Sequence, residues 1–294
     1  MPNSKIVPYI EAVFAVIVWG ASFIATKVAL EEISPVTIVW LRFMIGVGIL
    51  GVAVLARKQF TLPARNEWGY FALLGFLGIT FHQWLQSNGL QTSDASTTAW
   101  IVSTTPVFMA LLGWLVLKEN PGWRKTAGIM LAFAGVLLVS SKGELASISV
   151  GKFGAPGDAL ILVSAVNWAV FSILSQRGLK RHPASLMMFY VMALGWVFTS
   201  ALFFTGEGLG EITNLSARGW LGVGFLGIFC SGLAYIAWYD ALQALSTAQT
   251  GVFLYIEPLV AVVVAAIVLG EQVTPLSLLG GAVILFGVWL VNRD

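Results

Sequence analysis

The chain has 294 residues, of which 58% are hydrophobic and only 10% are charged, and its formal net charge is +2 at pH 7. A soluble domain carries about 25% charged residues, and a mean hydropathy of +0.87 exceeds what a soluble core can bury. The composition therefore excludes a soluble domain, and the small net charge gives no indication of a nucleic-acid partner.

Long apolar runs, bounded by charges, Gly, Pro and turn residues, predict membrane-spanning helices, because one span needs ~20 mostly apolar residues. The first run continues to about Leu30, longer than the apolar core of a signal peptide, so we expect an uncleaved span there. The predicted spans lie at about 8–30, 35–56, 67–89, 94–117, 121–140, 157–177, 184–205, 217–241, 247–269 and 275–292.

Positive charge in short loops predicts the orientation, because cytoplasmic loops carry the excess of Lys and Arg. With the N-terminus inside, eleven basic residues are cytoplasmic: Lys5, Arg57, Lys58, Arg65, Lys118, Arg124, Lys125, Arg177, Lys180, Arg181 and Arg293. Three are outside: Lys142, Lys152 and Arg218. Both termini are therefore expected on the cytoplasmic side.

The two halves of the sequence resemble each other. The run Gly75–Ile79 recurs as Gly224–Ile228, an offset of 149, and Trp19 matches Trp168 at the same offset. Farther along, the offset becomes 152, which pairs Pro106 with Pro258, Glu119 with Glu271, Gly128 with Gly280 and Gly135 with Gly287. Each half holds five predicted spans, so the second half enters the membrane from the opposite side. The expected fold is all-α and integral to the membrane, with ten transmembrane helices in two inverted repeats, residues 1–145 and 150–294.

Particular motifs make the resemblance to a known family specific. Trp19–Phe23 with Lys27, then Ser34-Pro35 and Arg42-Phe43, resembles the opening of an EamA repeat. The close of the second half, with Glu257-Pro258 and Leu269–Glu271, resembles the end of one. EamA repeats belong to the drug/metabolite transporter superfamily, and the resemblance covers nearly the whole chain. Among its members the chain looks most like ten-helix amino-acid exporters of the YddG type, which implies export of aromatic and other apolar amino acids from a bacterial inner membrane.

Polar and aromatic residues recur at helical spacing on single faces of several predicted spans. Because polar groups facing lipid are costly, these faces are expected to turn inward and line a path. The candidate substrate-binding residues are Trp19, Ser22, His82, Gln86, Trp100, Trp168, Ser231, Tyr235 and Tyr239. Indole and phenol rings suit an apolar side chain, while hydroxyl, amide and imidazole groups suit an amine and a carboxylate. Packing or a position in the interfacial aromatic belt is an alternative for each ring, and His82 could bond only Gln86 or a neighbouring helix.

Glu257 is unusual because it lies within predicted span nine, directly before Pro258. A charge at the centre of a span costs ~2.5–3.5 kcal/mol on insertion scales. One interpretation is a proton-coupling carboxylate. The other, which we favour, is a structural acid that bonds backbone donors where Pro258 bends the helix.

Charge restricts the substrate class. A phosphate needs Arg or Lys in the path. Apart from the basic residues already counted with the loops, only Lys27 and Arg42 lie within spans, both placed toward the outer ends. Small multidrug transporters, which resemble the first span, place a carboxylate near the position of Trp19, and its absence here disfavours a permanent cation unless Glu257 serves instead. A zwitterionic or neutral metabolite with an apolar part remains, while a cation, a sugar phosphate or a nucleotide sugar stay as alternatives.

An enzyme or a membrane scaffold is the alternative of a different class. The chain has two histidines, His82 and His182, and one cysteine, Cys230, so no metal cluster or Ser-His arrangement is visible. We therefore expect no enzymatic activity, cofactor or metal. The expected partners are the lipid bilayer and a small-molecule substrate, carried by alternating access within one monomer.

Overall fold

The protein is built of helices throughout the part that the computed structural model describes, residues 6–117, 122–141, 154–245 and 252–292, where no strand occurs. The first half contains α1 (Val7–Leu30), α2 (Pro35–Ala56), α3 (Trp68–Gly75), η2 (Phe76–Phe81), α4 (His82–Leu90), α5 (Ala95–Val102), α6 (Thr105–Leu117) and α7 (Gly122–Ser140). The second half contains α9 (Pro156–Leu179), α10 (Ala184–Thr205), α11 (Gly208–Thr213), α12 (Ala217–Gly224), η3 (Phe225–Leu233), α13 (Ala234–Ala244), α15 (Ile256–Val268) and α16 (Pro275–Asn292).

Eight helical stretches in the described residues are long and apolar enough to cross a membrane. Two further predicted spans are present in a different form. Residues 68–90 are helical throughout but consist of three segments, α3, η2 and α4, whereas α15 is a shorter apolar helix. Predicted span nine begins at residue 247, outside the described residues, and its helix α15 begins at Ile256. The all-helical membrane architecture is therefore confirmed, and ten spans remain a prediction.

Local helix geometry changes at corresponding places in the two halves. The π-helical segments η2 and η3 start at Phe76 and Phe225, which are counterparts in the sequence repeat. A π turn widens the helix and is frequent at functional sites. The helices before α6 and α15 also break shortly before Pro106 and Pro258, because proline removes a backbone donor and clashes with the preceding turn.

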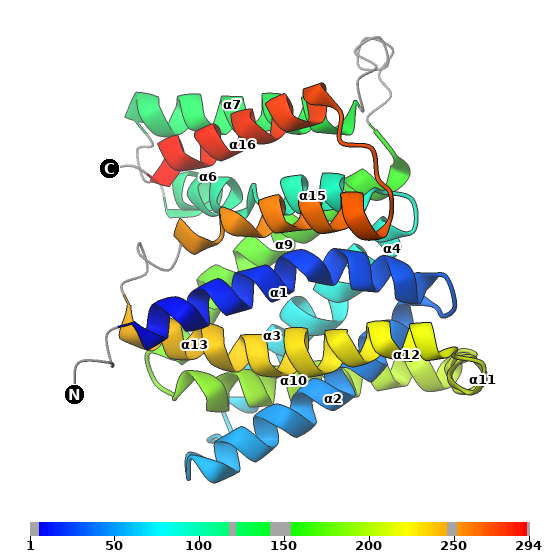
Figure 1. The fold of residues 1–294 in the computed structure, drawn as a ribbon. Helices are drawn as coiled ribbons and strands as arrows, with labels where there is room; N and C mark the ends of the chain where they lie inside the picture. The colour runs from blue at the N-terminus through cyan, green and yellow to red at the C-terminus, as the bar shows by residue number, and fades with distance from the viewer. Residues whose placement is uncertain (1–5, 118–121, 142–153, 246–251, 293–294) are drawn as a thin grey trace.

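The helices lie side by side, and the start of α1 lies at the same end of the bundle as the end of α16 (Figure 1). In the first half, α1 packs against α13 and α15 of the second half. In the second half, α9 packs against α4 and α6 of the first. The two halves are thus interleaved, and each contributes a helix that is surrounded by helices of the other.

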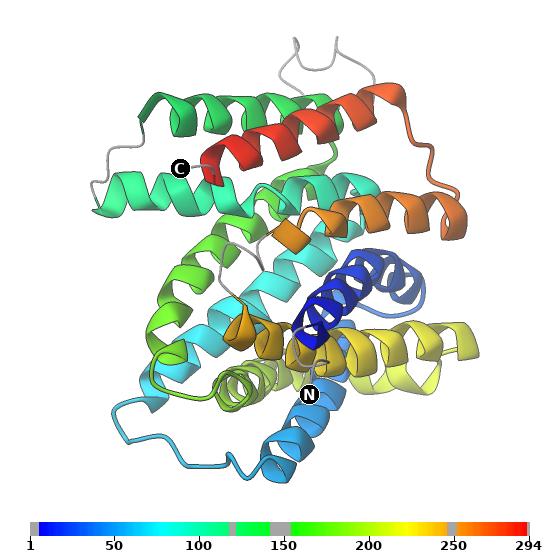
Figure 2. The same ribbon diagram turned by 60° about the vertical axis from the view of Figure 1, so that its left-hand side comes forward.

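Helices α7 and α16 form a separate layer, which both views show along one edge of the bundle (Figure 1, Figure 2). Their backbones approach closely at two glycine pairs. A Cβ on Gly128 would lie 2.6 Å from the carbonyl oxygen of Gly287, and a Cβ on Gly135 would lie 2.7 Å from that of Gly280. Small residues allow such contact where no water drives helices together.

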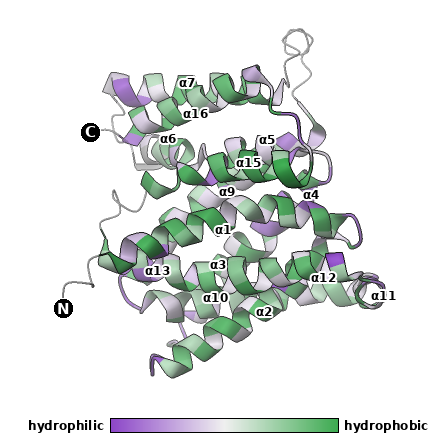
Figure 3. Cartoon of the chain, viewed as in Figure 1, coloured by the Kyte–Doolittle hydropathy of each residue, from purple (hydrophilic) through white to green (hydrophobic). Residues whose placement is uncertain are grey.

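Hydrophobic residues cover most of the length of the helices, and hydrophilic ones gather toward helix ends and connections (Figure 3). Large apolar side chains such as Ile267, Leu221 and Val52 are more than two-thirds exposed. A soluble protein rarely exposes so much apolar surface in contiguous patches, so the outer surface is suited to lipid.

We expect Gly135→Leu to lower the free energy of unfolding by roughly 1–3 kcal/mol, because the new side chain meets the Gly280 carbonyl and Ile284. Thermal unfolding in detergent measures this. The control is Gly48→Leu on α2, where an added Cβ meets nothing within 4 Å. Equal melting temperatures for the two variants would contradict the close approach of α7 and α16.

Candidate functional site

The side chain of Arg42, in the first half of α2, enters the interior of the bundle and is only 5% exposed. Its Nε donates to the Ser231 hydroxyl on η3 at 3.0 Å, and its Nη1 donates to the Gln83 amide oxygen on α4 at 3.0 Å. Its Cζ lies 5.1 Å from the centre of the Phe43 ring. The guanidinium therefore joins α2 to a helix of each half of the chain.

Arg42 has neutral hydrogen-bond partners only. No carboxylate of the described residues forms an ion pair with it. Among the same residues no acceptor is found for Nη2, and this atom is not one of the fully buried polar atoms without a hydrogen-bond partner. A guanidinium carries five N–H donors, so Arg42 keeps donors for a further acceptor.

This position differs from the sequence-based expectation. The residue count places Arg42 toward the outer end of its span and considers it only as a partner for a phosphate, whereas the structure buries it beside Ser231, a predicted site residue. The sequence does contain a signal for Arg42, because a charge within an apolar run is costly and indicates a functional site. Gln83 was also missed, since sequence spacing selects Gln86 instead.

Aromatic rings gather around Trp19 on α1, next to this arginine. Trp19 donates from Nε1 to the carbonyl of Cys230, the neighbour of Ser231, at 3.2 Å. Its ring centre lies 5.5 Å from that of Tyr235 in an edge-to-face arrangement and 5.3 Å from that of Trp238. Tyr239 continues the group, 6.2 Å from Tyr235. Four aromatic side chains thus form one group between α1 and α13.

A second aromatic group lies where α4 meets α9. The His82 ring lies 4.6 Å from Trp168, and Trp168 lies 4.7 Å from Phe171. The His82 Nδ1 is 3.2 Å from the Ser164 carbonyl oxygen. In the sequence repeat Trp168 is the counterpart of Trp19, and His82 is the counterpart of Ser231, at the offset of 149. Both groups therefore occupy equivalent places, and Gln83 links the second one to Arg42.

Three candidates are placed differently. The hydroxyl of Ser22 bonds the Trp19 carbonyl within its own helix at 2.6 Å, and Gln86 is half-buried on α4. Trp100 is packed against Gly281 of α16, in a hydrophobic cluster that includes residues of α7 and α16. The structure thus brings together Trp19, Ser231, Tyr235, Tyr239, His82 and Trp168, but it places Trp100 in another cluster.

Glu257 lies in the first turn of α15, which begins one residue earlier at Ile256. Its backbone carbonyl faces Gly20 of α1, where an added Cβ would lie 2.6 Å from the oxygen. A carboxylate in the first turn is stabilised by the free N–H groups and the dipole of the helix, and Pro258 in the same turn needs no N–H partner. No hydrogen bond of the Glu257 side chain occurs among the described residues, so both interpretations of this carboxyl stay predictions.

The end of the bundle that charge predicts to be extracellular is closed by polar contacts between the halves. Glu271 accepts hydrogen bonds from the backbone N–H groups of Ala95 and Ser96 and from the Ser96 hydroxyl, at 2.7–3.1 Å. Lys27 donates to the Ser93 carbonyl at 2.7 Å and lies 3.9 Å from Glu271. Ser93 donates to Asp158 at 2.5 Å. The residues at the start of α5 are therefore held to the end of α1, to the start of α9 and to the segment that follows α15.

At the opposite end, one ion pair and one further side-chain hydrogen bond join neighbouring elements. Arg57 makes two hydrogen bonds to Asp240, at 2.7 and 2.6 Å. The side chain of Asp240 hydrogen-bonds Arg57 and raises the pKa of its guanidinium. His182 lies 3.0 Å from Glu67, and this hydrogen bond is the main cause that lowers the pKa of the Glu67 carboxyl. Both contacts link an element of the first half to an element of the second half.

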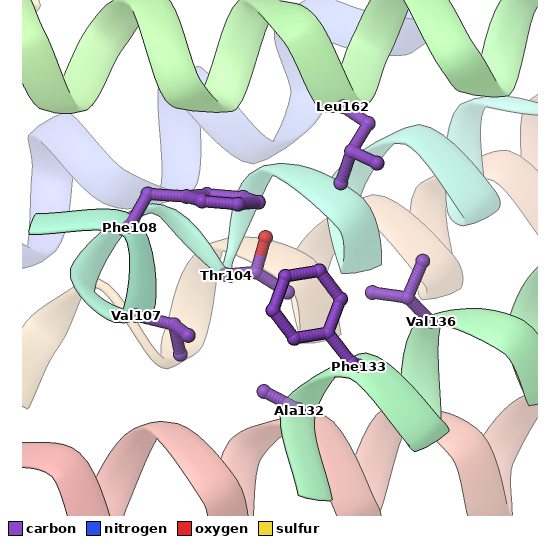
Figure 4. A pocket seen from close by; sticks show the side chains of 7 residues that line it. All are labelled: Thr104, Val107, Phe108, Ala132, Phe133, Val136 and Leu162. Carbon is purple, nitrogen blue, oxygen red and sulfur yellow. The ribbon is translucent and has the colours of Figure 1, made fainter. Parts of the chain in front are cut away.

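A small hollow lies elsewhere, between α6, α7 and α9 (Figure 4). It has about 170 Å³ of space between atoms but no room for a water molecule. Its lining is apolar apart from Thr104 and consists of Thr104, Val107, Phe108, Ala132, Phe133, Val136 and Leu162. We interpret it as a packing gap, since polar groups that could orient a solute are lacking there.

No group of three or more His, Cys, Asp or Glu that could hold a metal ion occurs in the part of the chain that the structure describes. Cys230 is a free, buried cysteine whose thiol lies 3.6 Å from the Val18 carbonyl. The described site can therefore hold a solute through hydrogen bonds, through the charge of Arg42 and through contacts with aromatic rings.

Known proteins that resemble the chain are transporters. The model of the EamA-like transporter family matches residues 7–141 and 155–293. An uncharacterized transporter of Archaeoglobus fulgidus is 30% identical over 290 residues, covering 99% of this chain and 98% of the relative. An uncharacterized inner membrane transporter of Escherichia coli is 28% identical, with 98% and 92% covered. These relatives, like the family, are transporters and not enzymes.

Two further comparisons bear on substrate and fold. A probable terminal-alkyne amino-acid exporter of Streptantibioticus cattleyicolor is 28% identical over 288 residues, covering 96% of this chain and 92% of the relative. A solved crystal structure superimposes with a TM-score of 0.67 over 96% of this chain and 95% of the other, at 20% identity. At that identity the likeness shows the fold alone.

We expect Glu271→Ala to lower the free energy of unfolding by about 1–3 kcal/mol, because the N–H groups of Ala95 and Ser96 lose their acceptor. Thermal unfolding measures the effect. Glu31→Ala is the matched control at the same end, since Glu31 is 51% exposed and pairs with Arg218 at the surface, where pairs contribute little. A melting temperature equal to that of the control would show that Glu271 does not hold this end together.

Proposed function

The chain belongs to the EamA-like transporter family, and we propose that it is a secondary transporter that exports small amphiphilic metabolites, most of all aromatic and apolar amino acids. Family membership and similarity to an amino-acid exporter support this proposal. The similarity to an inner membrane transporter and the loop charges support a position in the inner membrane with cytoplasmic termini.

The observation that carries the proposal is the meeting of two aromatic groups around one buried arginine. Trp19, which contacts Tyr235, is joined to Arg42 through the Cys230 carbonyl and the neighbouring Ser231 hydroxyl. His82, which contacts Trp168, directly precedes Gln83, which accepts a hydrogen bond from Arg42. Rings suit an apolar side chain and polar groups fix its orientation, as small-molecule sites require. We assign Trp19, His82, Trp168, Ser231, Tyr235 and Tyr239 to the substrate site.

Alternating access between two inverted repeats, residues 1–145 and 150–294, is the mechanism that we propose. Interleaved packing of α1 and α9 into the opposite halves supports it. The π-helical segments η2 and η3 also support it, because they begin at corresponding residues of the two halves. A helix can adjust its shape at such a segment through small changes in the backbone. In this mechanism the described state is closed at the Lys27–Glu271 end. The site lies between the repeats, as in other inverted-repeat transporters, and one chain suffices for a path.

Two other substrate classes are weaker candidates. A phosphorylated solute would need more basic residues, and Lys27 is already bonded to Ser93 and Glu271. A permanent cation would need a carboxylate beside the aromatic groups, and within the described residues no hydrogen bond of the Trp19 or His82 side chain involves one. Glu257, whose backbone carbonyl faces Gly20 next to Trp19, is the acid that could serve a cation instead.

Uptake of labelled Phe, Trp, Thr, Met, Lys, a sugar phosphate and a quaternary ammonium cation into proteoliposomes tests the substrate. We expect saturable flux of Phe and Trp. Trp168→Ala should reduce it by roughly 10-fold, since loss of ring contacts with a bound aromatic side chain costs about 1–1.5 kcal/mol. Trp123→Ala, at an exposed ring beside Arg124, is the control and should leave flux unchanged. Flux of the cation or the phosphate alone would contradict the amino-acid proposal.

A reversible cross-link tests alternating access. Ser93 and Asp158 are hydrogen-bonded between the two halves, so Ser93→Cys with Asp158→Cys, in a Cys230→Ala background, should form a disulfide. We expect oxidation to stop transport and reduction to restore it, because the closed end can no longer open. Each single cysteine variant is the control for oxidation itself. Undiminished transport by fully cross-linked protein would rule out the proposed opening.

A further inference from the structure

We propose that Arg42 is the anion-binding residue of the transport site and that the solute is recognised through a carboxylate, which forms an ion pair with the guanidinium. This inference rests on the proposed transport function and names the chemical group that the site selects. The amine of an amino acid is then not required, so a carboxylic acid with an aromatic tail should also be a substrate.

The first step of the argument is the cost of a buried charge. Arg42 is 95% buried in the interior of a lipid-solvated bundle, where a charge must be paired or hydrogen-bonded. Its two hydrogen-bond partners, Ser231 and Gln83, are neutral. For structural purposes alone an apolar residue would pack better, because even a complete buried ion pair is often no more stabilising than an apolar replacement. An arginine kept in this state points to a ligand that supplies the negative charge.

The second step selects the kind of anion. A guanidinium binds a carboxylate through two parallel N–H···O bonds, and one arginine neutralises its single charge. A phosphate monoester carries about −1.5 to −2 at neutral pH and needs a second cation. Lys27, which also lies within a predicted span, is bonded to Ser93 and Glu271 at the end of the bundle. A carboxylate therefore fits the charge of the site, and a phosphate does not.

The third step concerns the rest of the solute. Ser231, which binds Arg42, and Tyr235, which contacts Trp19, are four residues apart. Trp19 also bonds the carbonyl of Cys230, the neighbour of Ser231, so the aromatic group begins close to the residue that holds the guanidinium. This arrangement suits a carboxylate that is separated from a ring by two carbon atoms, as in phenylalanine, tryptophan and 3-phenylpropionate.

Gln83 and Ser231 are positioning residues in this account. They accept hydrogen bonds from Nη1 and Nε, which fixes the plane of the guanidinium and leaves Nη2 with donors to spare. Because they come from different halves of the chain, a movement between the halves changes how Arg42 is held. A carboxylate bound there would therefore favour one arrangement of the halves over the other.

The first experiment compares solutes in the wild-type protein. Tryptophan, tryptamine, tryptophan methyl ester and 3-phenylpropionate are tested both for flux and for the rise in melting temperature that a bound ligand causes. We expect the two carboxylates to stabilise and to be carried, and the amine and the ester to do neither. Equal stabilisation by tryptamine or the ester would overturn the inference, as would stabilisation by phenyl phosphate but not by 3-phenylpropionate.

The second experiment supplies the negative charge from the protein. Gln83→Glu replaces an amide oxygen that is already 3.0 Å from Nη1 with a carboxylate of the same shape. We expect a higher melting temperature without ligand, loss of stabilisation by tryptophan and at least about a 30-fold fall in transport efficiency, because loss of a buried charge-pair partner has effects of this size. Gln59→Glu is the matched control, since the Gln59 amide oxygen accepts from the neutral Ser185 hydroxyl.

These readouts separate the two hypotheses. A stable Gln83→Glu variant that carries tryptophan at the wild-type rate would show that Arg42 is structural and would leave the transport function standing. Stabilisation by carboxylates that the variant abolishes, without flux of any solute, would support the Arg42 site and contradict the proposed transport. Arg42→Lys keeps the charge and should weaken stabilisation by tryptophan without abolishing it, which a purely structural role would not predict.

Discussion

A charged side chain inside a lipid-solvated bundle constrains the structure around it. Arg42 cannot face the hydrocarbon, so α2 must turn this position inward and neighbouring helices must present acceptors to it. Ser231 and Gln83 do so from η3 and α4, which fixes α2 between a helix of each half. The aromatic groups around Trp19 and Trp168 lie beside the same two helices. Site and fold are thus organised by the same buried charge.

Close contact between helix backbones makes this arrangement possible in lipid, where no water drives the helices together. Gly46 on α2 faces Ser231, where an added Cβ would lie 2.7 Å from the serine Cβ, so glycine lets η3 come within reach of Arg42. The glycine pairs between α7 and α16 hold these two helices together in a layer that lies apart from Arg42. The bundle therefore combines a tightly packed layer with a central region in which π-helical segments interrupt regular packing. Such a division suits a protein that must be rigid in one place and movable in another.

Much of the fold follows from the sequence, because long apolar runs between polar turns determine where helices form. The bounds 35–56, 184–205 and 275–292 agree with α2, α10 and α16. The π-helical segments do not follow from hydropathy, since they depend on packing against other helices. The site is harder to predict: helical spacing selects Trp100 as a candidate, but its ring packs on Gly281, from a distant part of the chain. The cost argument that drew attention to Glu257 applies equally to Arg42, yet position along a span does not reveal which way a side chain turns.

A structure of the protein bound to 5-bromotryptophan, with the bromine located by its anomalous scattering, tests the central claim most directly. The account predicts the ligand carboxylate within hydrogen-bond distance of the Arg42 guanidinium and the bromine among the rings of Trp19, Tyr235 and Trp238. A ligand bound elsewhere, with Arg42 still bonded only to Ser231 and Gln83, would contradict it.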